Sequence, residues 1–238
     1  MTGAASTASP TPWSAWLRPA LPPILLLLLA LLLSWSPLDV ALQHWFHDPA
    51  AGWLVDAKAP WSRRLFYDGP KVALVILGVV LSLLLLLGFW RRGLRGIRRE
   101  LVFLLLCLAL VPTAANRLKQ VTDVYCPSQT TEFGGRYRHV PPFGFHPEAK
   151  RSPGRCFPAG HASGGFALLS LGWLSGQRAW RIAGVGLGLA AGSVMAAYQM
   201  AKGAHFLSHS LATLALAWLM IAMLASWFGL PCREEPPP

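Results

Sequence analysis

Charged residues are scarce in this chain of 238 residues: they make up 13% of it, and only 10 residues are acidic. Soluble domains usually carry about 25% charged residues. Hydrophobic residues, in contrast, make up 54% of the chain, and the mean hydropathy is +0.44. This composition argues against a soluble domain and predicts an integral membrane protein.

A recognisable nucleic-acid-binding motif is also missing, although a net charge of +11 would suggest that function in a soluble protein. The arginines lie instead in short loops between apolar runs, where they set membrane topology and attract anionic lipid. We therefore expect membrane lipid, and no nucleic acid, as the partner of the basic residues.

Cysteine is rare as well, and the 4 residues are of two kinds. Cys107 lies inside an apolar run and Cys232 lies near the C-terminus, and both are expected to be inert thiols. Cys126 and Cys156 lie in one polar loop, so we expect a disulfide between them if that loop faces an oxidising compartment. Two free thiols are the alternative.

No strand pattern precedes the glycines Gly184, Gly186, Gly188 and Gly192. A nucleotide-binding loop requires a strand, a turn and a helix in that order. Glycines four residues apart inside an apolar run are typical instead of a helix face that packs closely on a neighbour.

Apolar runs are abundant, and a transmembrane helix takes about 20 mostly apolar residues. No small-residue cleavage site follows the first run, so we expect a retained helix; a signal peptide is the alternative for so short a run. The segment from Pro37 to Pro70 is expected to lie outside the membrane or flat in its interface. The runs expected to span the bilayer cover residues 21–35, 71–90, 101–118, 161–174, 182–200 and 205–228.

The predicted fold class is therefore all-α, a polytopic membrane bundle of about six transmembrane helices with both termini in the cytoplasm. The turn from Arg91 to Arg99 is the densest positive segment, and the positive-inside rule places it in the cytoplasm. The loop from Lys119 to Phe157 also contains lysines and arginines, so a bare count would not favour this orientation, but long loops count for less. On this topology Lys119, His161 and His205 emerge at the outer face.

Two of the apolar runs begin with a histidine. Before His161, Pro158 suits the first turn of a helix and Gly160 allows a close backbone approach. His205 opens another apolar run in the same manner. Because helix N-termini attract anions, these two histidines and Lys119 suit an anionic group that undergoes acid–base chemistry or nucleophilic attack.

A zinc site is one alternative, because His205 and His209 are four residues apart and could act with His161. The acid that follows the first histidine of a zinc-protease helix is missing, since Phe206 takes its place. A structural role at the membrane interface is the other alternative. We expect no metal and no cofactor.

These residues resemble the type 2 phosphatidic acid phosphatase (PAP2) superfamily, which shares its site with the vanadium haloperoxidases. The family pattern is lysine, six residues and Arg-Pro; then Pro-Ser-Gly-His; then Ser-Arg, five residues, His, three residues and Asp. At the same spacings this chain has Lys119 and Cys126-Pro127, then Pro158-Ala159-Gly160-His161, then Tyr198-Gln199, His205 and His209. The departures from the pattern include Cys126, Ala159, Gln199 and His209.

The resemblance implies that His205 is the nucleophile, which forms a phosphohistidine, and that His161 protonates the leaving oxygen. His209, one helical turn after His205, would orient the nucleophilic ring without the charge of the family's aspartate. Two arginines that would clamp phosphate are lost. The phosphate oxygens are expected to be held by Lys119, Arg155, Gly160 and Lys202.

The resemblance further implies a PAP2-like transmembrane domain at residues 21–230, between a disordered or interfacial segment at 1–20 and a polar tail at 231–238. The implied activity is hydrolysis or transfer of the phosphate of a lipid, at the periplasmic or outer face of a bacterial inner (cytoplasmic) membrane. The alternative is a non-catalytic lipid-phosphate-binding or transport protein on a decayed phosphatase scaffold. The particular lipid, the choice between hydrolysis and transfer, and the oligomeric state remain open.

Overall fold

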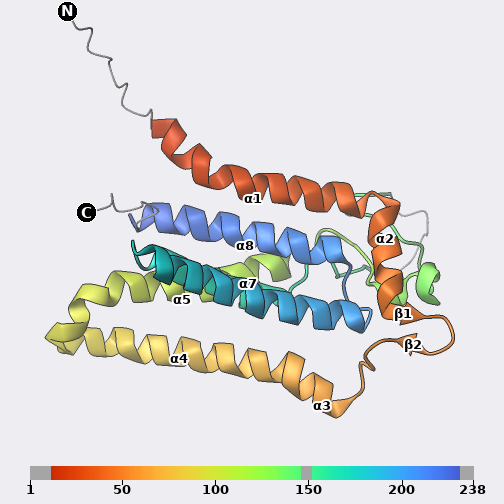
Figure 1. Cartoon of the computed structure of the whole chain (residues 1–238), viewed down its shortest axis with the longest axis horizontal. Coiled ribbons are helices and arrows are strands. Elements are labelled where there is room, and N and C mark those ends of the chain that lie inside the picture. Colours follow the sequence, from red (N-terminus) through yellow and green to blue (C-terminus); the bar gives the residue numbers. More distant parts are fainter. Residues whose placement is uncertain (1–11, 146–151, 231–238) are drawn as a thin grey trace, which may run out of the picture.

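The computed structural model describes residues 12–145 and 152–230, with side chains from residue 20 onward. The polar tail at 231–238 and most of the N-terminal segment at 1–20 lie outside this description. The described chain is an elongated bundle of helices that run roughly along one axis (Figure 1). In chain order, the elements are α1 (Pro12–Ser34), α2 (Pro37–Gln43), η1 (His44–Phe46), β1 (His47–Asp48), β2 (Gly52–Trp53), α3 (Pro60–Arg63), η2 (Arg64–Asp68), α4 (Gly69–Trp90), η3 (Arg92–Ile97), α5 (Arg98–Leu118), η4 (Pro127–Gln129), η5 (Thr131–Phe133), α6 (Ala162–Ala167), η6 (Leu168–Trp173), α7 (Arg178–Ala201) and α8 (Leu207–Trp227). Since β1 and β2 are a two-residue antiparallel pair, the all-α class is confirmed.

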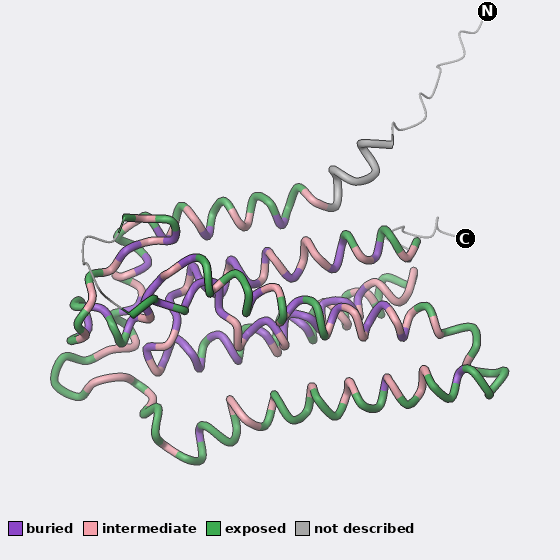
Figure 2. Tube along the Cα trace, turned by 180° about the vertical axis from the view of Figure 1, so that it is seen from behind, coloured by how far each residue is buried: buried purple, intermediate pink, exposed green. Residues whose placement is uncertain are grey.

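The core lies where α5, α6, α7 and α8 meet. Phe103 and Val111 of α5 pack there with Phe166 of α6 and Ile221 of α8, and all four are buried. Helix α1 lies along α8, and α4 lies on the other side beside α5 (Figure 1). Most of α4 is exposed although it is apolar (Figure 2). An exposed apolar face of this kind is what contact with lipid requires.

In the part of the chain that the structure describes, four helical segments are long and apolar enough to cross a bilayer: Pro60–Trp90, Arg92–Leu118, Arg178–Ala201 and Leu207–Trp227. A fifth is obtained if Ala20–Ser34 and Pro37–Phe46, which meet at 81°, form one span. The count is therefore four to five where the sequence predicted about six. The segment predicted to span at 161–174 is not in this count, because the structure divides it into α6 and the 3₁₀ helix η6, which have 6 residues each.

Glycines of α7 form a close contact with α6 and η6. A Cβ atom on Gly188 would lie 2.3 Å from the backbone nitrogen of Leu169, and Gly184 and Gly192 have similarly close neighbours in η6 and α6. Gly186 has nothing within 4 Å. The predicted packing face is thus confirmed for three of the glycines, while Gly186 points away from it.

The two ends of the bundle differ in character. One end carries the arginine-rich η3 turn and the C-terminal end of α8, and the opposite end carries the C-terminal end of α5 and the N-terminal ends of α6 and α8 (Figure 1). Lys119, His161 and His205 therefore share one end, as the predicted topology requires. The arginine-rich turn lies at the other end.

Candidate active site

A cavity of about 800 Å³ lies between α4, α5 and α6 and reaches the two histidines. Its apolar part follows one face of α4 from Leu74 to Leu83 and one face of α5 from Leu105 to Pro112. Its polar part combines residues from five separate segments of the chain: Tyr67, Lys71, Asn116, Lys119, Gly160, His161, Gln199 and His205. The cavity is thus polar at one end and apolar along its length.

Lys119 reaches the cavity because α5 ends immediately before it. Its backbone N–H donates to the carbonyl of Ala115 at 3.2 Å, which closes the last turn. A Cβ atom on Gly160 would lie 2.9 Å from Oδ1 of Asn116 and 3.4 Å from Nζ of Lys119. Glycine at position 160 therefore leaves room for both polar side chains, and a larger residue would displace them.

His161 occupies the N-cap position of α6 and stacks flat on Tyr67, with ring centroids 3.9 Å apart and planes 8° apart. Its Nε2 atom is buried and has no hydrogen-bond partner among the described residues. Burial, and then the positive charge of Lys202, lowers the pKa of His161 to about 4, while hydrogen bonding to the Phe66 carbonyl opposes this shift. The imidazole is therefore neutral at pH 7 unless a negative charge binds beside it.

His205 follows a tight turn between α7 and α8. Gly203 has a φ of +73°, which favours glycine, and a Cβ atom there would lie 2.3 Å from the ring of Trp53. The His205 side chain is buried, and its Nδ1 atom has no hydrogen-bond partner in the described part of the chain. Burial lowers the pKa of His205 to about 3, and the charge of Lys119 adds to the effect. The ring is thus neutral, the form in which an imidazole nitrogen acts as a nucleophile.

His209 packs behind His205, one helical turn further along α8. It is 1% exposed, and the two rings meet edge to face with centroids 5.7 Å apart. The carbonyl of Cys156 interacts with both rings, and Nδ1 of His209 has no hydrogen-bond partner among the described residues. His209 does not line the cavity. In the part of the chain that the structure describes, no three His, Cys, Asp or Glu side chains are placed to hold a metal ion.

Lys202 lies beside the cavity and does not line it. Its Nζ atom lies over the rings of Tyr67 and Tyr198, at 4.8 and 4.9 Å from their centroids. From there its charge acts on His161 and on His205. Burial lowers the pKa of Lys202 itself.

A family model, that of the PAP2 superfamily, matches residues 100–230, which is more than half of the chain. The chain belongs to the PAP2 superfamily. Searches of curated proteins and of solved structures find no significant match. Membership supports a phosphatase-type activity on phosphate esters.

The positions at which this PAP2 chain departs from the family pattern have distinct surroundings. Gln199, in the place of an arginine, is 3% exposed and lines the cavity, and its Nε2 atom has no hydrogen-bond partner within residues 12–145 and 152–230. Ala159, in the place of the serine, is fully buried and donates its N–H to the carbonyl of His209 at 3.1 Å. Arg155, a candidate to replace the lost charge, is exposed and does not line the cavity. Among lysines and arginines, the geometry favours Lys71 over Arg155 as a phosphate neighbour.

Cys126, where the family has its other arginine, forms a disulfide with Cys156, and their Cα atoms are 5.2 Å apart. Beside it, the N–H of Cys156 donates to the carbonyl of Val124 at 2.9 Å, and the N–H of Gly154 donates to the carboxylate of Asp123 at 2.7 Å. These contacts tie the segment that follows α5 to the segment that precedes α6. Both segments carry residues of the cavity.

Tyr67, Lys71 and Asn116 line the polar part of the cavity and were not predicted from the sequence. Asn116 lies one helical turn before Lys119, so the helical period alone could have identified it. Tyr67 and Lys71 flank Asp-Gly-Pro at the start of a long apolar run, at the same end of the bundle as the histidines. Polar residues at that position are the signal that could have pointed to them.

Proposed function

We propose that this PAP2 protein hydrolyses, or transfers, the phosphate of a lipid phosphate through a phosphohistidine at His205. The observation that carries the proposal is a set of buried, unpartnered polar atoms at one end of the cavity. These are Nε2 of His161, Nε2 of Gln199 and Nδ1 of His205. Buried polar atoms are nearly always hydrogen-bonded, so three together indicate a polar ligand.

Lysines supply the positive charge that a phosphate needs. Lys71 and Lys119 line the cavity, and the charge of Lys202 reaches both histidines. A lysine is a point charge, whereas the guanidinium of arginine binds two phosphate oxygens in a fixed plane. We therefore expect Gln199 and the backbone near Gly160 to orient the phosphate that the lysines attract.

The length of the cavity supports a lipid as the carrier of that phosphate. Between Lys71 and Leu83, α4 rises by roughly 18 Å. The cavity-lining side chains along this stretch, apart from Ser82, are apolar. Since α4 belongs to a candidate membrane span, a hydrocarbon chain can lie along it while the phosphate meets the polar end.

In the first step of the proposed reaction, a neutral nitrogen of His205 attacks phosphorus. The N–P bond forms as the bond from phosphorus to the lipid oxygen breaks, and His161 donates a proton to that oxygen. The negative charge of the bound phosphate raises the pKa of His161 and so supplies the protonated form. In the second step His161 takes a proton from water, or from an acceptor hydroxyl, whose oxygen attacks phosphorus while the N–P bond breaks.

The proposed site faces the periplasm or the exterior of the inner membrane. Two features support this orientation. The arginine-rich turn, expected in the cytoplasm, lies at the opposite end of the bundle (Figure 1). The Cys126–Cys156 disulfide lies beside the site, and disulfides persist in oxidising compartments.

Phosphate release by the purified protein from a panel of lipid phosphates in detergent micelles tests the proposal. We expect His205→Asn to abolish turnover and to prevent formation of an acid-labile phosphoenzyme. His161→Gln should slow turnover by about 10²–10⁴-fold, the usual contribution of a general acid. This loss should shrink with a nitrophenyl phosphate, whose leaving group needs no proton.

His44→Gln is the matched control, because His44 lies at the same end of the bundle but is exposed and does not line the cavity. It should retain full turnover. Normal turnover by the His205→Asn variant would refute the mechanism. Binding of lipid phosphates by the unmodified protein without phosphate release would favour the non-catalytic alternative.

A further inference from the structure

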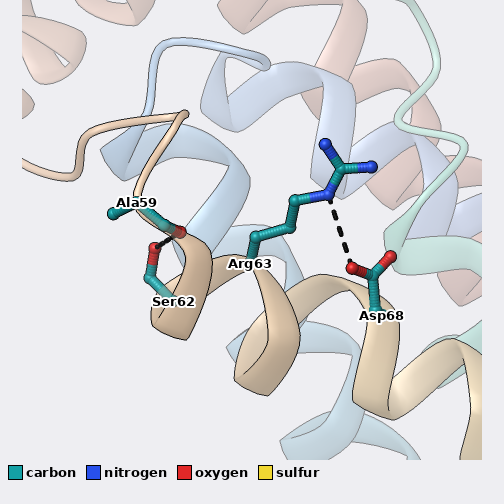
Figure 3. A network of polar contacts seen from close by, with 4 residues as sticks. All are labelled: Ala59, Ser62, Arg63 and Asp68. Atoms are coloured by element: carbon teal, nitrogen blue, oxygen red, sulfur yellow. Dashed lines mark hydrogen bonds and ion pairs between the residues drawn. The ribbon is translucent and has the colours of Figure 1, made fainter.

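The segment that precedes α4 contains a π-helical turn, η2, which carries Tyr67 to His161. The N–H of Gly69 bonds to the carbonyl of Arg64, five residues earlier, where an α-helix would use the residue four earlier. The side chains of Arg63 and Asp68 pair across the turn at 3.4 Å (Figure 3). Both side chains are well exposed, so this ion pair contributes little to the stability of the turn.

The sequence explains why the turn forms at this position. In an α-helix the N–H of residue 70 would donate to the carbonyl of Phe66, four residues earlier. Pro70 has no N–H, so this hydrogen bond cannot form. A Cβ atom on Gly69 would lie 2.8 Å from the carbonyl oxygen of Arg64, so glycine permits the close turn. The Phe66 carbonyl hydrogen-bonds with His161 instead.

The extra residue of a π-turn changes which side chain faces α6. One residue corresponds to about 100° of rotation around a helix. With this rotation the ring of Tyr67 lies flat on His161 at 3.9 Å between centroids. The same tyrosine ring has Nζ of Lys202 at 4.8 Å from its centroid. The Tyr67 ring and the Phe66 carbonyl, both from η2, thus contact His161 together.

We propose that Tyr67 is a positioning residue for His161: its ring fixes the plane of the imidazole so that the proton is delivered along one direction into the cavity. This inference rests on the proposed role of His161 as the acid. Tyr67 lies outside residues 100–230, the region that matches the PAP2 family. The acid of the matched region would therefore be aligned by a turn from the preceding part of the chain.

Steady-state kinetics of Tyr67→Phe and Tyr67→Leu test the inference. The phenylalanine variant keeps a flat ring and should retain most of the turnover. The leucine variant removes it and should lower kcat for a lipid phosphate by about 10- to 100-fold, the size expected from a misaligned catalytic group. KM should change little, because Tyr67 acts on the proton donor. The loss should largely disappear with a nitrophenyl phosphate.

A double-mutant cycle with His161→Gln separates positioning from a purely structural effect. Adding Tyr67→Leu to His161→Gln should cause no further loss of turnover. Tyr137→Leu is the matched control, because Tyr137 stacks on Tyr125 at the same 3.9 Å centroid distance away from the cavity. It removes a comparable stack and should leave the leaving-group dependence unchanged.

Three results would overturn the inference, and a fourth would overturn its foundation. If Tyr67→Leu slows both substrates equally, or if its loss adds to that of His161→Gln, then Tyr67 stabilises the fold or binds substrate and does not position the acid. If Tyr67→Phe is as slow as Tyr67→Leu, the hydroxyl matters and the ring does not. If His161→Gln itself shows no dependence on the leaving group, the proposed acid fails and this inference fails with it.

Discussion

His209 occupies the position from which an aspartate orients the nucleophilic histidine in the PAP2 family pattern. It is buried behind His205, and its Nδ1 atom has no hydrogen-bond partner in the described structure. A histidine here lacks the fixed negative charge that would make His205 more basic. The third residue of α8 is also a favourable position for a carboxylate, because it lies at the positive end of the helix dipole.

We expect His209→Asp to preserve or raise kcat, since a carboxylate at this position can orient and polarise His205. His209→Leu, which removes both ring nitrogens, is the comparison variant and should lower kcat. Turnover of a lipid phosphate by the two purified proteins measures the effect. A larger loss in the aspartate variant than in the leucine variant would show that position 209 serves packing alone.

Single residues of the site were predictable where a linear motif places them. Lys119, Gly160, His161 and His205 stand at fixed spacings, and all four line the cavity. Tyr67 was not predicted, because its contact with the site depends on the π-helical turn η2. A hydrophobic pattern in the sequence does not indicate such a turn. The position of Lys202 over two tyrosine rings likewise depends on tertiary packing.

The packing of helix α7 on η6 and α6 depends on the glycines of α7. Its glycines at four-residue spacing let the backbone of η6 approach directly, as the sequence predicted. The length of α6 and η6 was not predictable in the same way, because an apolar run does not reveal that its second half is a 3₁₀ helix. A count of long continuous helices therefore omits this segment, whereas hydropathy alone counts it as one span.

We expect Gly188→Leu to destabilise the bundle by about 1–3 kcal/mol or more, the cost of overpacking a close contact. Gly186→Leu is the control on the same helix, because nothing lies within 4 Å of a Cβ atom at that position. That control should be neutral or stabilising, since leucine favours helix over glycine. Thermal unfolding of both proteins in detergent measures the difference. Equal midpoints would contradict the packing face.

The two ends of the bundle axis carry different features. The arginine-rich turn lies at one end, and the cavity's polar part lies at the other (Figure 1). Composition and charge pattern predicted this polarity and the helical class, but they do not show that α4 leans away from the core. The cavity depends on that placement, which only the packed structure reveals.

We expect Arg95→Cys to be protected from an impermeant thiol reagent in intact cells and Arg136→Cys to react, because the proposed orientation puts the arginine-rich turn in the cytoplasm. Both positions are exposed. A Cys232→Ser background avoids labelling at that native position, and Cys107 is buried. Reaction at position 95 with none at position 136 would reverse the orientation.

The apolar part of the cavity lies between α4 and α5, within segments that are candidate membrane spans. A lipid substrate in the same bilayer would meet this enzyme by lateral diffusion. The quantity that governs saturation is then the mole fraction of substrate in the membrane, and dilution with inert lipid would lower the rate even at constant bulk concentration. Under the proposed lipid-phosphate activity, bilayer composition would therefore be part of the enzyme's rate law.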